Sequence, residues 1–485
     1  MSMTCSTLLD QILDEFTAIA TIPRPSHHEE QIAEYLCNWA VRHGLSCVRD
    51  EIGNVIMEKD AAPGYEKAPR VILQAHMDMV CVAAKGITYD PMKDGIKIIR
   101  DDQFISADGT SLGADDGIGI AIALVLLAEK TLIHGPLRAL FTVNEEDGMS
   151  SSAIDPKYLD ADYLINLDWE WLGSLCNSSA GGDFAAFTRT YQSHAAEPDC
   201  AALKIELTGL LGGHSGVDIH RGRANALICT GRLLQELALA QIDYQLASFH
   251  GGQARNAIPT SAEATILIHP HILAQAYKFL EHYSAELRTA YGEIERHMAL
   301  RWELADVAPS YVMPKADSDA LLRLLQTLPN GIHTLSPYVE GLTESSQNLG
   351  LLTADDGKIT LSAMLRSCAA YYAKELLSID RTLADGFGFE FVRGEHSPAW
   401  AVNPKSRLTP LTCRIYQTLT GSDMVVEPIH GALECGAFFE KNPHLDMIAI
   451  GPSLFDVHTP KERCDLHSVQ VTAELITGIL KELCQ

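Results

Sequence analysis

The segment Val71-Ile72-Leu73-Gln74-Ala75-His76-Met77-Asp78 begins with an apolar run typical of a buried strand and ends with an imidazole and a carboxylate. Similar apolar runs occur at residues 137–143, 163–167 and 447–450, and a strongly apolar helix pattern covers 118–128. Strands that alternate with helices are typical of an α/β domain. We therefore expect a mostly parallel sheet flanked by helices.

Polar residues of metal-binding types follow each of these runs. His76 and Asp78 follow the first run, and the turn 111–117, which contains Asp115, leads into the predicted helix. The later runs are followed by Glu145 and Glu146, by Asp168, and by His458. Ligands of open α/β sheets bind outside the carboxyl ends of the strands, so these seven residues predict one shared site.

The donor types of this set indicate zinc. Two imidazoles with several carboxylates suit Zn²⁺, and Mn²⁺ or Co²⁺ are plausible substitutes. Two ions fit the donors better than one. If Asp115 bridges, His76 and Asp168 complete one site, while Glu146 and His458 complete the other.

Asp78 and Glu145 receive different roles. In an extended segment residues i and i+2 face the same side, so Asp78 can accept the second ring N–H of His76. The side chains of Glu145 and Glu146 diverge, so one can bind metal while the other takes a proton from water; we assign Glu145 as general base. Each residue alone could be a solvated loop carboxylate or a structural histidine, and the metal site is favoured by the ordered set.

The pattern of strands and helices restarts between about residues 184 and 397. Strands are predicted near 202–207, 264–268 and 359–363, and helices near 225–239 and 271–289. This pattern predicts a catalytic domain in two parts, 1–183 and 398–485, interrupted by an inserted α+β domain at 184–397. At the N-terminus, residues 1–23 predict an amphipathic helix. Ser26 and Glu29 have the spacing of a capping box that would open a second helix ending near residue 41.

Composition and charge restrict the partners. The 485 residues are 47% hydrophobic and 21% charged, which is typical of a folded globular protein. With 37 Lys and Arg against 63 Asp and Glu, the net charge of −26 disfavours nucleic acid and membrane partners. We see no signal peptide and no apolar run of bilayer length, and the 12 cysteines form no C-x-x-C pair. These features predict a cytoplasmic protein with reduced thiols.

The ordered set resembles the M20 metallopeptidases, and more narrowly the aminoacyl-histidine (Xaa-His) dipeptidases, over nearly the whole chain. The resemblance rests on Gln74-Ala75-His76-Met77-Asp78-Met79-Val80, Leu112-Gly113-Ala114-Asp115, Gly212-Gly213-His214-Ser215-Gly216, Arg255-Asn256-Ala257-Ile258-Pro259 and Leu433-Glu434-Cys435-Gly436. It implies a zinc-binding catalytic domain interrupted by a lid domain, with the same ligands and base. It also implies a homodimer that hydrolyses small peptides with a free amino end, such as β-alanyl-histidine.

The resemblance also suggests roles for lid residues. His214 matches a histidine that helps to stabilise the developing oxyanion, sometimes from the partner subunit. Asn256 and Arg366 look like the groups that receive the terminal carboxylate of the substrate. The alternative for each is a structural role in the lid. Glu434 matches a position near the site, with no role assigned.

Two departures from the family pattern leave the substrate preference open. Asp116 stands where relatives usually carry Asn, and residues 169–172 replace a more acidic stretch. A tripeptide aminopeptidase or an N-acyl amino-acid deacylase would use the same metal pair. A metal- or peptide-binding protein without catalysis is the non-enzyme alternative, and the presence of Glu145 and of every ligand argues against it.

Overall fold

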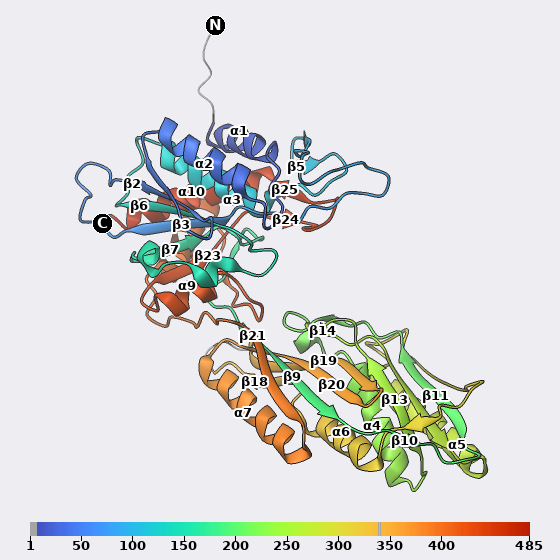
Figure 1. The fold of residues 1–485 in the computed structure, drawn as a ribbon. Coiled ribbons are helices and arrows are strands. Elements are labelled where there is room, and N and C mark those ends of the chain that lie inside the picture. The colour runs from blue at the N-terminus through green and yellow to red at the C-terminus, as the bar shows by residue number, and fades with distance from the viewer. Residues whose placement is uncertain (1–6, 338, 340) are drawn as a thin grey trace. The chain divides into compact units, whose positions relative to one another are not determined.

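The computed structural model describes residues 7–337, 339 and 341–485, and the chain forms two compact units (Figure 1). The first unit, here the catalytic unit, comprises Met1–Ser179, Trp400–Ile429 and Leu433–Gln485. The second, the inserted unit, comprises Ala180–Ala399 and His430–Ala432. Each unit has a hydrophobic core of its own, as expected of a domain.

The central sheet of the catalytic unit has six strands in the order β1-β2-β6-β3-β7-β23. These strands are β1 (Ser46–Arg49), β2 (Val55–Lys59), β6 (Leu137–Thr142), β3 (Val71–His76), β7 (Tyr163–Asn166) and β23 (Asp446–Ala449). Strand β3 runs parallel to β6 and β7, and β7 runs parallel to β23. The first two strands of the order, β1 and β2, are antiparallel to their neighbours. The predicted α/β fold with a mostly parallel sheet is confirmed.

Helices cover both faces of this sheet (Figure 1). They are α1 (Leu8–Ala20), α2 (Glu30–Arg42), α3 (Ala114–Ala128), α8 (Leu408–Thr420), α9 (Cys435–Lys441) and α10 (Leu466–Glu482). Side chains alternate along a strand, so Val71 and Leu73 of β3 pack in one core with α1, α3 and α10. Ile72 packs on the opposite face with α9. Because β3 is buried on both faces, its first three residues are all apolar.

The start of α2 differs from the prediction. The N-cap position is Glu29 and no side chain caps the helix, so the predicted capping box is absent. The Ser26 hydroxyl donates instead to Oδ2 of Asp78 at 2.7 Å. Oε1 of Glu29 accepts from the backbone N–H groups of His27 and Asn144. Both side chains therefore connect the helix start to distant loops rather than to the helix itself.

Smaller sheets complete the two units. In the catalytic unit, β24 (Leu454–Phe455), β25 (Arg463–Asp465), β5 (Phe104–Ala107) and β4 (Ile98–Arg100) form a sheet in that order, and β8 (Ser174–Leu175) pairs with β22 (Val425–Val426). In the inserted unit, β10 (His194–Ala195) pairs with β17 (Tyr311–Val312), and β12 (Gly213–His214) pairs with β14 (Ala257–Ile258).

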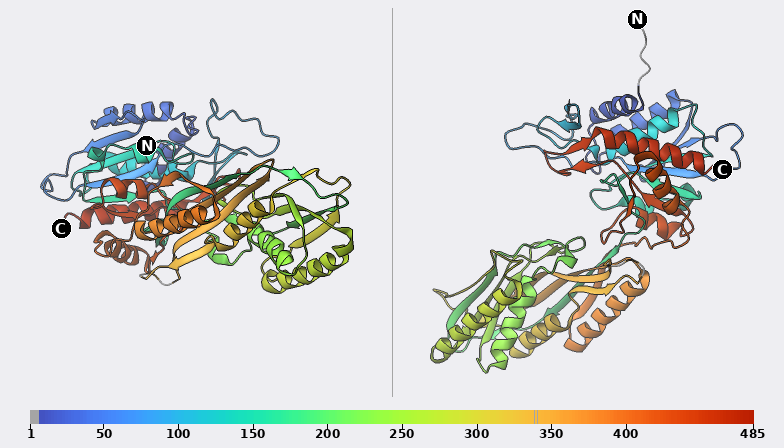
Figure 2. Two further views of the ribbon diagram at one scale, coloured as in Figure 1. Left: turned by 60° about the horizontal axis from the view of Figure 1, so that its bottom comes forward. Right: turned by 180° about the vertical axis from the view of Figure 1, so that it is seen from behind.

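The inserted unit is built on an antiparallel sheet of nine strands. In order these are β16 (Ala299–Leu304), β11 (Ala201–Thr208), β15 (Ala262–Ile268), β13 (Gln245–Gly251), β19 (Thr343–Asp355), β20 (Lys358–Ser367), β9 (Gly181–Thr190) and β21 (Glu390–Ser397), with β18 (Gly331–Leu335) paired to β19. Four helices pack against it: α4 (Ala226–Leu239), α5 (Leu273–Tyr291), α6 (Lys315–Thr327) and α7 (Ala370–Phe387) (Figure 2).

Two general properties follow from the described residues. None of their helices has both the length and the apolar character needed to cross a bilayer. Every cysteine among them is a free thiol.

One buried carboxyl group lies between α7 and β19 of the inserted unit. Oδ1 of Asp380 accepts a hydrogen bond from Nε2 of Gln347 at 2.9 Å. Oδ2 of Asp380 and Oε1 of Gln347 are both buried and have no partner among the described residues. Burial raises the pKa of Asp380 to about 7, against the lowering effect of the Gln347 hydrogen bond. A protonated carboxyl, which can donate a hydrogen bond, suits this position.

We expect Asp380→Asn to stabilise the chain at about pH 8 by about 2–4 kcal/mol. The unfolded carboxyl ionises near 3.8, whereas the folded one keeps its proton up to about 7. The free energy of unfolding of the wild type therefore falls as the pH rises from 3.8 to about 7. The neutral amide of the Asp380→Asn variant does not ionise, so the variant keeps its stability. Urea unfolding at about pH 5 and pH 8 measures the difference, with the exposed Asp385→Asn of the same helix as control. An equal difference at both pH values would contradict the assignment.

Candidate metal centre

The seven residues of the predicted site meet at one edge of the central sheet. Strand β3 ends at His76, β6 is followed by Glu145 and Glu146, and β7 is followed by Asp168. Asp115 lies in the first turn of α3, where its backbone is not helical. His458 comes from the loop between β24 and β25. The parallel arrangement of the strands places their carboxyl ends, and hence these side chains, together.

Three donors surround a first position. Nε2 of His76 lies 2.9 Å from Oδ1 of Asp115 and 3.6 Å from Oδ1 of Asp168. Donor atoms of the three residues all lie within 4.8 Å of one another. Burial, reinforced by nearby carboxylates, raises the pKa of Asp168. Acid groups held this closely in a buried place repel one another, and a cation there would remove the repulsion.

Three donors surround a second position, and Asp115 belongs to both. Nε2 of His458 lies 3.0 Å from Oδ2 of Asp115 and 3.0 Å from Oε1 of Glu146. Donor atoms of these residues also lie within 4.8 Å of one another. The two carboxylates raise the pKa of His458 to about 11. Each oxygen of Asp115 therefore faces a different imidazole, and Asp115 is common to both groups of donors.

Asp78 organises the loops around these positions. Its Oδ1 lies 3.4 Å from Nδ1 of His76, so it faces the ring nitrogen that points away from Asp115. Its oxygens also accept from the backbone N–H groups of Glu145 and Glu146, both at 3.1 Å. Burial opposes ionisation, but these partners prevail and lower the pKa of Asp78 to about 2. One carboxylate thus fixes both a histidine ring and the loop with the two glutamates.

Glu145 has the environment of a proton acceptor held beside charged groups. Burial, together with the carboxylates of Glu434, Asp115 and Glu146, raises its pKa to about 8, against the opposing effect of His76. A carboxyl group whose pKa is moved towards neutrality can take up and release a proton at physiological pH.

Glu462 and Arg24 hold the Asp115 turn, and sequence reasoning missed both. Oε2 of Glu462 accepts from the backbone N–H groups of Leu112 and Gly113, and Oε1 accepts from that of Ala114. Arg24 donates to the carbonyl oxygens of Asp78 and Gly113. Gly113 has φ +69°, and a β-carbon there would lie 2.6 Å from Nη2 of Arg24. The turn therefore requires glycine at position 113, and it is held by the buried side chains of Glu462 and Arg24.

Glu434, whose role the sequence left open, is a fully buried partner of the strand ends. Its Oε2 accepts from Nε2 of Gln74 and from Oγ1 of Thr142, each at 2.7 Å. Asp116, one of the departures from the family pattern, accepts from the backbone N–H of His76 at 3.2 Å. Burial and the charge of Asp168 raise the pKa of Asp116. Both residues position the chain around His76.

The predicted lid residues belong to the inserted unit. Nη2 of Arg366 on β20 lies 3.0 Å from Nε2 of His214 on β12. Arg366 is only 5% exposed, and no acidic side chain among the described residues pairs with it. Burial lowers its pKa to about 10. The carbonyl oxygen of Asn256 accepts from the backbone N–H of Ser215, and the Asn256 side chain is exposed.

Comparison with known proteins identifies the family. Residues 72–482 match the model of peptidase family M20/M25/M40. The chain is 35% identical to the cytosol non-specific dipeptidase of Escherichia coli (strain K12), over 97% of each chain. The crystal structure of aminoacylhistidine dipeptidase from Vibrio alginolyticus is similar, with a TM-score of 0.92, 33% identity and 99% of each chain covered. Aminopeptidase PepT from Bacillus cereus shares the fold, with a TM-score of 0.56 and 16% identity over 98% of this chain and 99% of its own. The family predicted from the sequence is confirmed, and the chain is a metallopeptidase of the M20 family.

Proposed function

We propose that the chain is a cytoplasmic dipeptidase that hydrolyses unblocked dipeptides at a centre of two zinc ions. Xaa-His dipeptides such as β-alanyl-histidine are among its proposed substrates. The observation that carries this proposal is the pair of donor triads that share Asp115 beside Glu145. The names of the two similar proteins, a non-specific dipeptidase and an aminoacylhistidine dipeptidase, support dipeptides as the substrate class.

The two triads supply the proposed ligands. His76, Asp115 and Asp168 hold one ion, and Asp115, Glu146 and His458 hold the other. Nitrogen and oxygen donors without sulfur suit Zn²⁺ and also admit Mn²⁺ or Co²⁺. The surplus of buried carboxylates over imidazoles supports cations at this place.

The residues around the triads perform the proton chemistry. When bound, the metal ions polarise the scissile carbonyl and lower the pKa of a water molecule. Glu145 accepts the proton of that water and passes it to the leaving amine. Asp78 keeps Glu145 in place through its backbone N–H and keeps the His76 ring oriented through Nδ1. Asp78 therefore acts by positioning and takes no part in proton transfer.

The inserted unit supplies the proposed contacts to the substrate ends. Arg366 binds the terminal carboxylate of the dipeptide, with Asn256 beside it, and His214 stabilises the oxyanion. A buried guanidinium without an acidic partner supports this role, because a buried charge is costly until it is paired. We further propose that the chain acts as a homodimer.

Metal removal and restoration with a panel of substrates tests the proposal. We expect a chelator to abolish hydrolysis, Zn²⁺ to restore it, and Mg²⁺ at the same concentration to fail, because Mg²⁺ prefers oxygen donors. Among β-Ala-His, Leu-Gly, Leu-Gly-Gly and N-acetyl amino acids, the two dipeptides should be cleaved fastest. Activity that survives complete metal removal would exclude the metal centre. Faster cleavage of Leu-Gly-Gly would contradict the proposed dipeptidase function and favour a tripeptide aminopeptidase. Faster cleavage of the N-acetyl compounds would favour a deacylase.

A further inference from the structure

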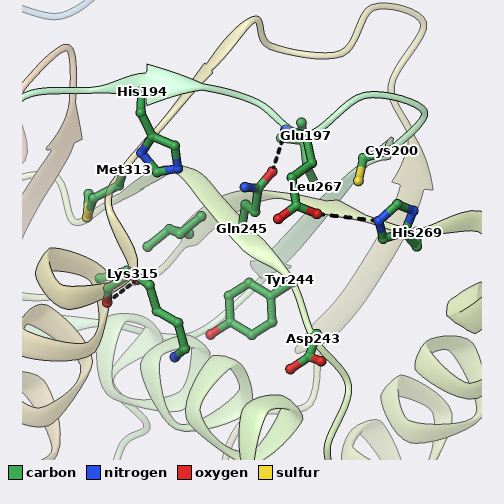
Figure 3. Close-up of a pocket in the computed structure, with 12 residues that line it drawn as sticks. His194, Glu197, Cys200, Asp243, Tyr244, Gln245, Leu267, His269, Met313 and Lys315 are labelled. Carbon is green, nitrogen blue, oxygen red and sulfur yellow. Dashed lines mark hydrogen bonds and ion pairs between the residues drawn. The ribbon is translucent and has the colours of Figure 1, made fainter.

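A second group of metal-ligating side chains lies in the inserted unit, at the end of the strand pair β11 and β15 (Figure 3). These strands are antiparallel, and the register pairs Ala201 with Ile268. Cys200 precedes the first of these residues and His269 follows the second, so they come from neighbouring points on two paired strands. Glu197 lies on the connection between β10 and β11.

The three side chains converge. One donor atom each of Glu197, Cys200 and His269 lies within 4.8 Å of the other two. Oε2 of Glu197 is 3.4 Å from Nε2 of His269. Figure 3 shows the carboxylate and the imidazole facing each other, with the sulfur of Cys200 on the same side. Carboxylate, thiolate and imidazole are all established ligands of Zn²⁺, and a small closure of these side chains brings them to coordinating distance.

The backbone that carries the donors is held by the sheet. The backbone N–H of Glu197 donates to Oε1 of Gln245 at 3.0 Å, and that of Ala196 donates to the carbonyl of Ser310. His269 begins a short 3₁₀ turn, in which its carbonyl accepts from Ile272. Ligands on such supports lose little conformational freedom when they bind an ion.

The donors open onto a cavity of about 400 Å³. Besides the three donors, its lining includes His194, Gln245 and Lys315. Three protein ligands with free space beside them leave room for a water molecule or another small ligand as the fourth donor. This is the arrangement of zinc sites that are not closed by protein alone.

An exposed ion pair between Glu197 and His269 is the alternative interpretation. Such a pair contributes at most about 1 kcal/mol, and it gives no role to the neighbouring thiol. The third donor of a different chemical type therefore favours a metal ion. A carboxylate and a thiolate together also match the charge of a divalent cation.

We propose that Glu197, Cys200 and His269 bind one ion of the Zn²⁺ class, separate from the catalytic centre. On binding, the Cys200 thiol releases its proton to solvent and the sulfur forms a bond to the metal, with no change of oxidation state. The set contains sulfur, whereas the proposed catalytic ligands do not. This difference makes the two kinds of site distinguishable by spectroscopy.

Titration of the full chain with Co²⁺ tests the proposal. The wild type should develop a near-ultraviolet thiolate-to-cobalt charge-transfer band that Zn²⁺ reverses. It should also bind one more equivalent of Co²⁺ per chain than Cys200→Ser, because the proposed catalytic centre admits Co²⁺ but has no thiolate. Cys200→Ser should abolish the band, and His269→Ala and Glu197→Gln should each weaken it. All three variants should keep full peptidase activity. Cys413→Ser, which removes a half-buried thiol on α8, is the matched control and should keep the band.

The outcomes separate this proposal from the proposed catalytic function. Absence of the band in the wild type, or its persistence in Cys200→Ser, would exclude the second site and leave the catalytic centre unaffected. A band lost in Cys200→Ser, with activity and the catalytic metal retained, would establish it.

Discussion

Glu145→Ala is expected to lower kcat by about 10²–10⁴-fold, the usual contribution of a general base, while the metal content stays that of the wild type. The reason is geometric. Glu145 lies beside both donor triads without belonging to either, and burial together with the neighbouring carboxylates raises its pKa to about 8. Its removal therefore takes away a proton acceptor and leaves every proposed ligand. Steady-state kinetics on a dipeptide, together with elemental analysis of the purified variant, measure both quantities.

Two further variants sharpen this experiment. Glu145→Gln keeps the size of the side chain but cannot accept the proton, so its kcat should be as low as that of the alanine variant. Asp147→Ala removes an exposed acid two residues further along the same loop, and its only described ion pair is with His27. This control should retain nearly the wild-type rate. An unchanged rate in Glu145→Ala would contradict the proposed mechanism, and loss of metal in that variant would assign Glu145 to the ligands.

Arg366→Ala should lower kcat/KM for a dipeptide by about 10–100-fold, since a hydrogen bond to a charged group contributes about 1.5–3 kcal/mol. Arg366 is buried and its pKa is lowered to about 10, which leaves it charged at neutral pH. The carboxylate of a peptide would supply the missing opposite charge. Arg366→Lys keeps the charge but loses the planar fork, so part of the loss should remain. The exposed Arg323→Ala on α6 serves as control for a general change of the inserted unit.

The substrate supplies a second control for Arg366. A dipeptide amide lacks the terminal negative charge, so the wild type should cleave it slowly. Arg366→Ala should then reduce its cleavage much less than that of the free dipeptide. Equal losses for both substrates would show that Arg366 supports the fold of the inserted unit and does not recognise the carboxylate.

The strands that carry the site were predictable because they are buried on both faces. Strands β3, β6, β7 and β23 are fully buried, so each consists mainly of apolar residues. The edge strand β1 was not predicted, since its short sequence is largely exposed and carries no pattern. The two units divide at residues 180 and 400, with residues 430–432 added to the second, whereas the sequence placed boundaries at 184 and 398. Composition changes too gradually there to locate a boundary to a few residues.

The seven residues of the proposed metal centre were predicted because each follows a strand or begins a helix. Glu462 and Arg24 were not predicted, because they bind backbone groups and therefore follow no side-chain pattern. Glu462 also lies about 350 residues from the turn that it holds. The contacts of Glu434 with Gln74 and Thr142 likewise arise only in the folded chain. The prediction of a capping box at Ser26 was wrong for a related reason. The hydroxyl of Ser26 donates a hydrogen bond to Asp78, which is distant in the sequence, and does not cap the helix backbone.

The clamp of Glu462 on the turn at Leu112 to Ala114 has a consequence for synthesis of the chain. Ribosomes make proteins from the N-terminus, and early domains begin to fold while later ones are still being made. His458 and Glu462 are synthesised after the whole inserted unit. A growing chain therefore exposes the turn without its clamp and one proposed metal position without its histidine. We therefore expect a chain that ends before His458 to lack peptidase activity.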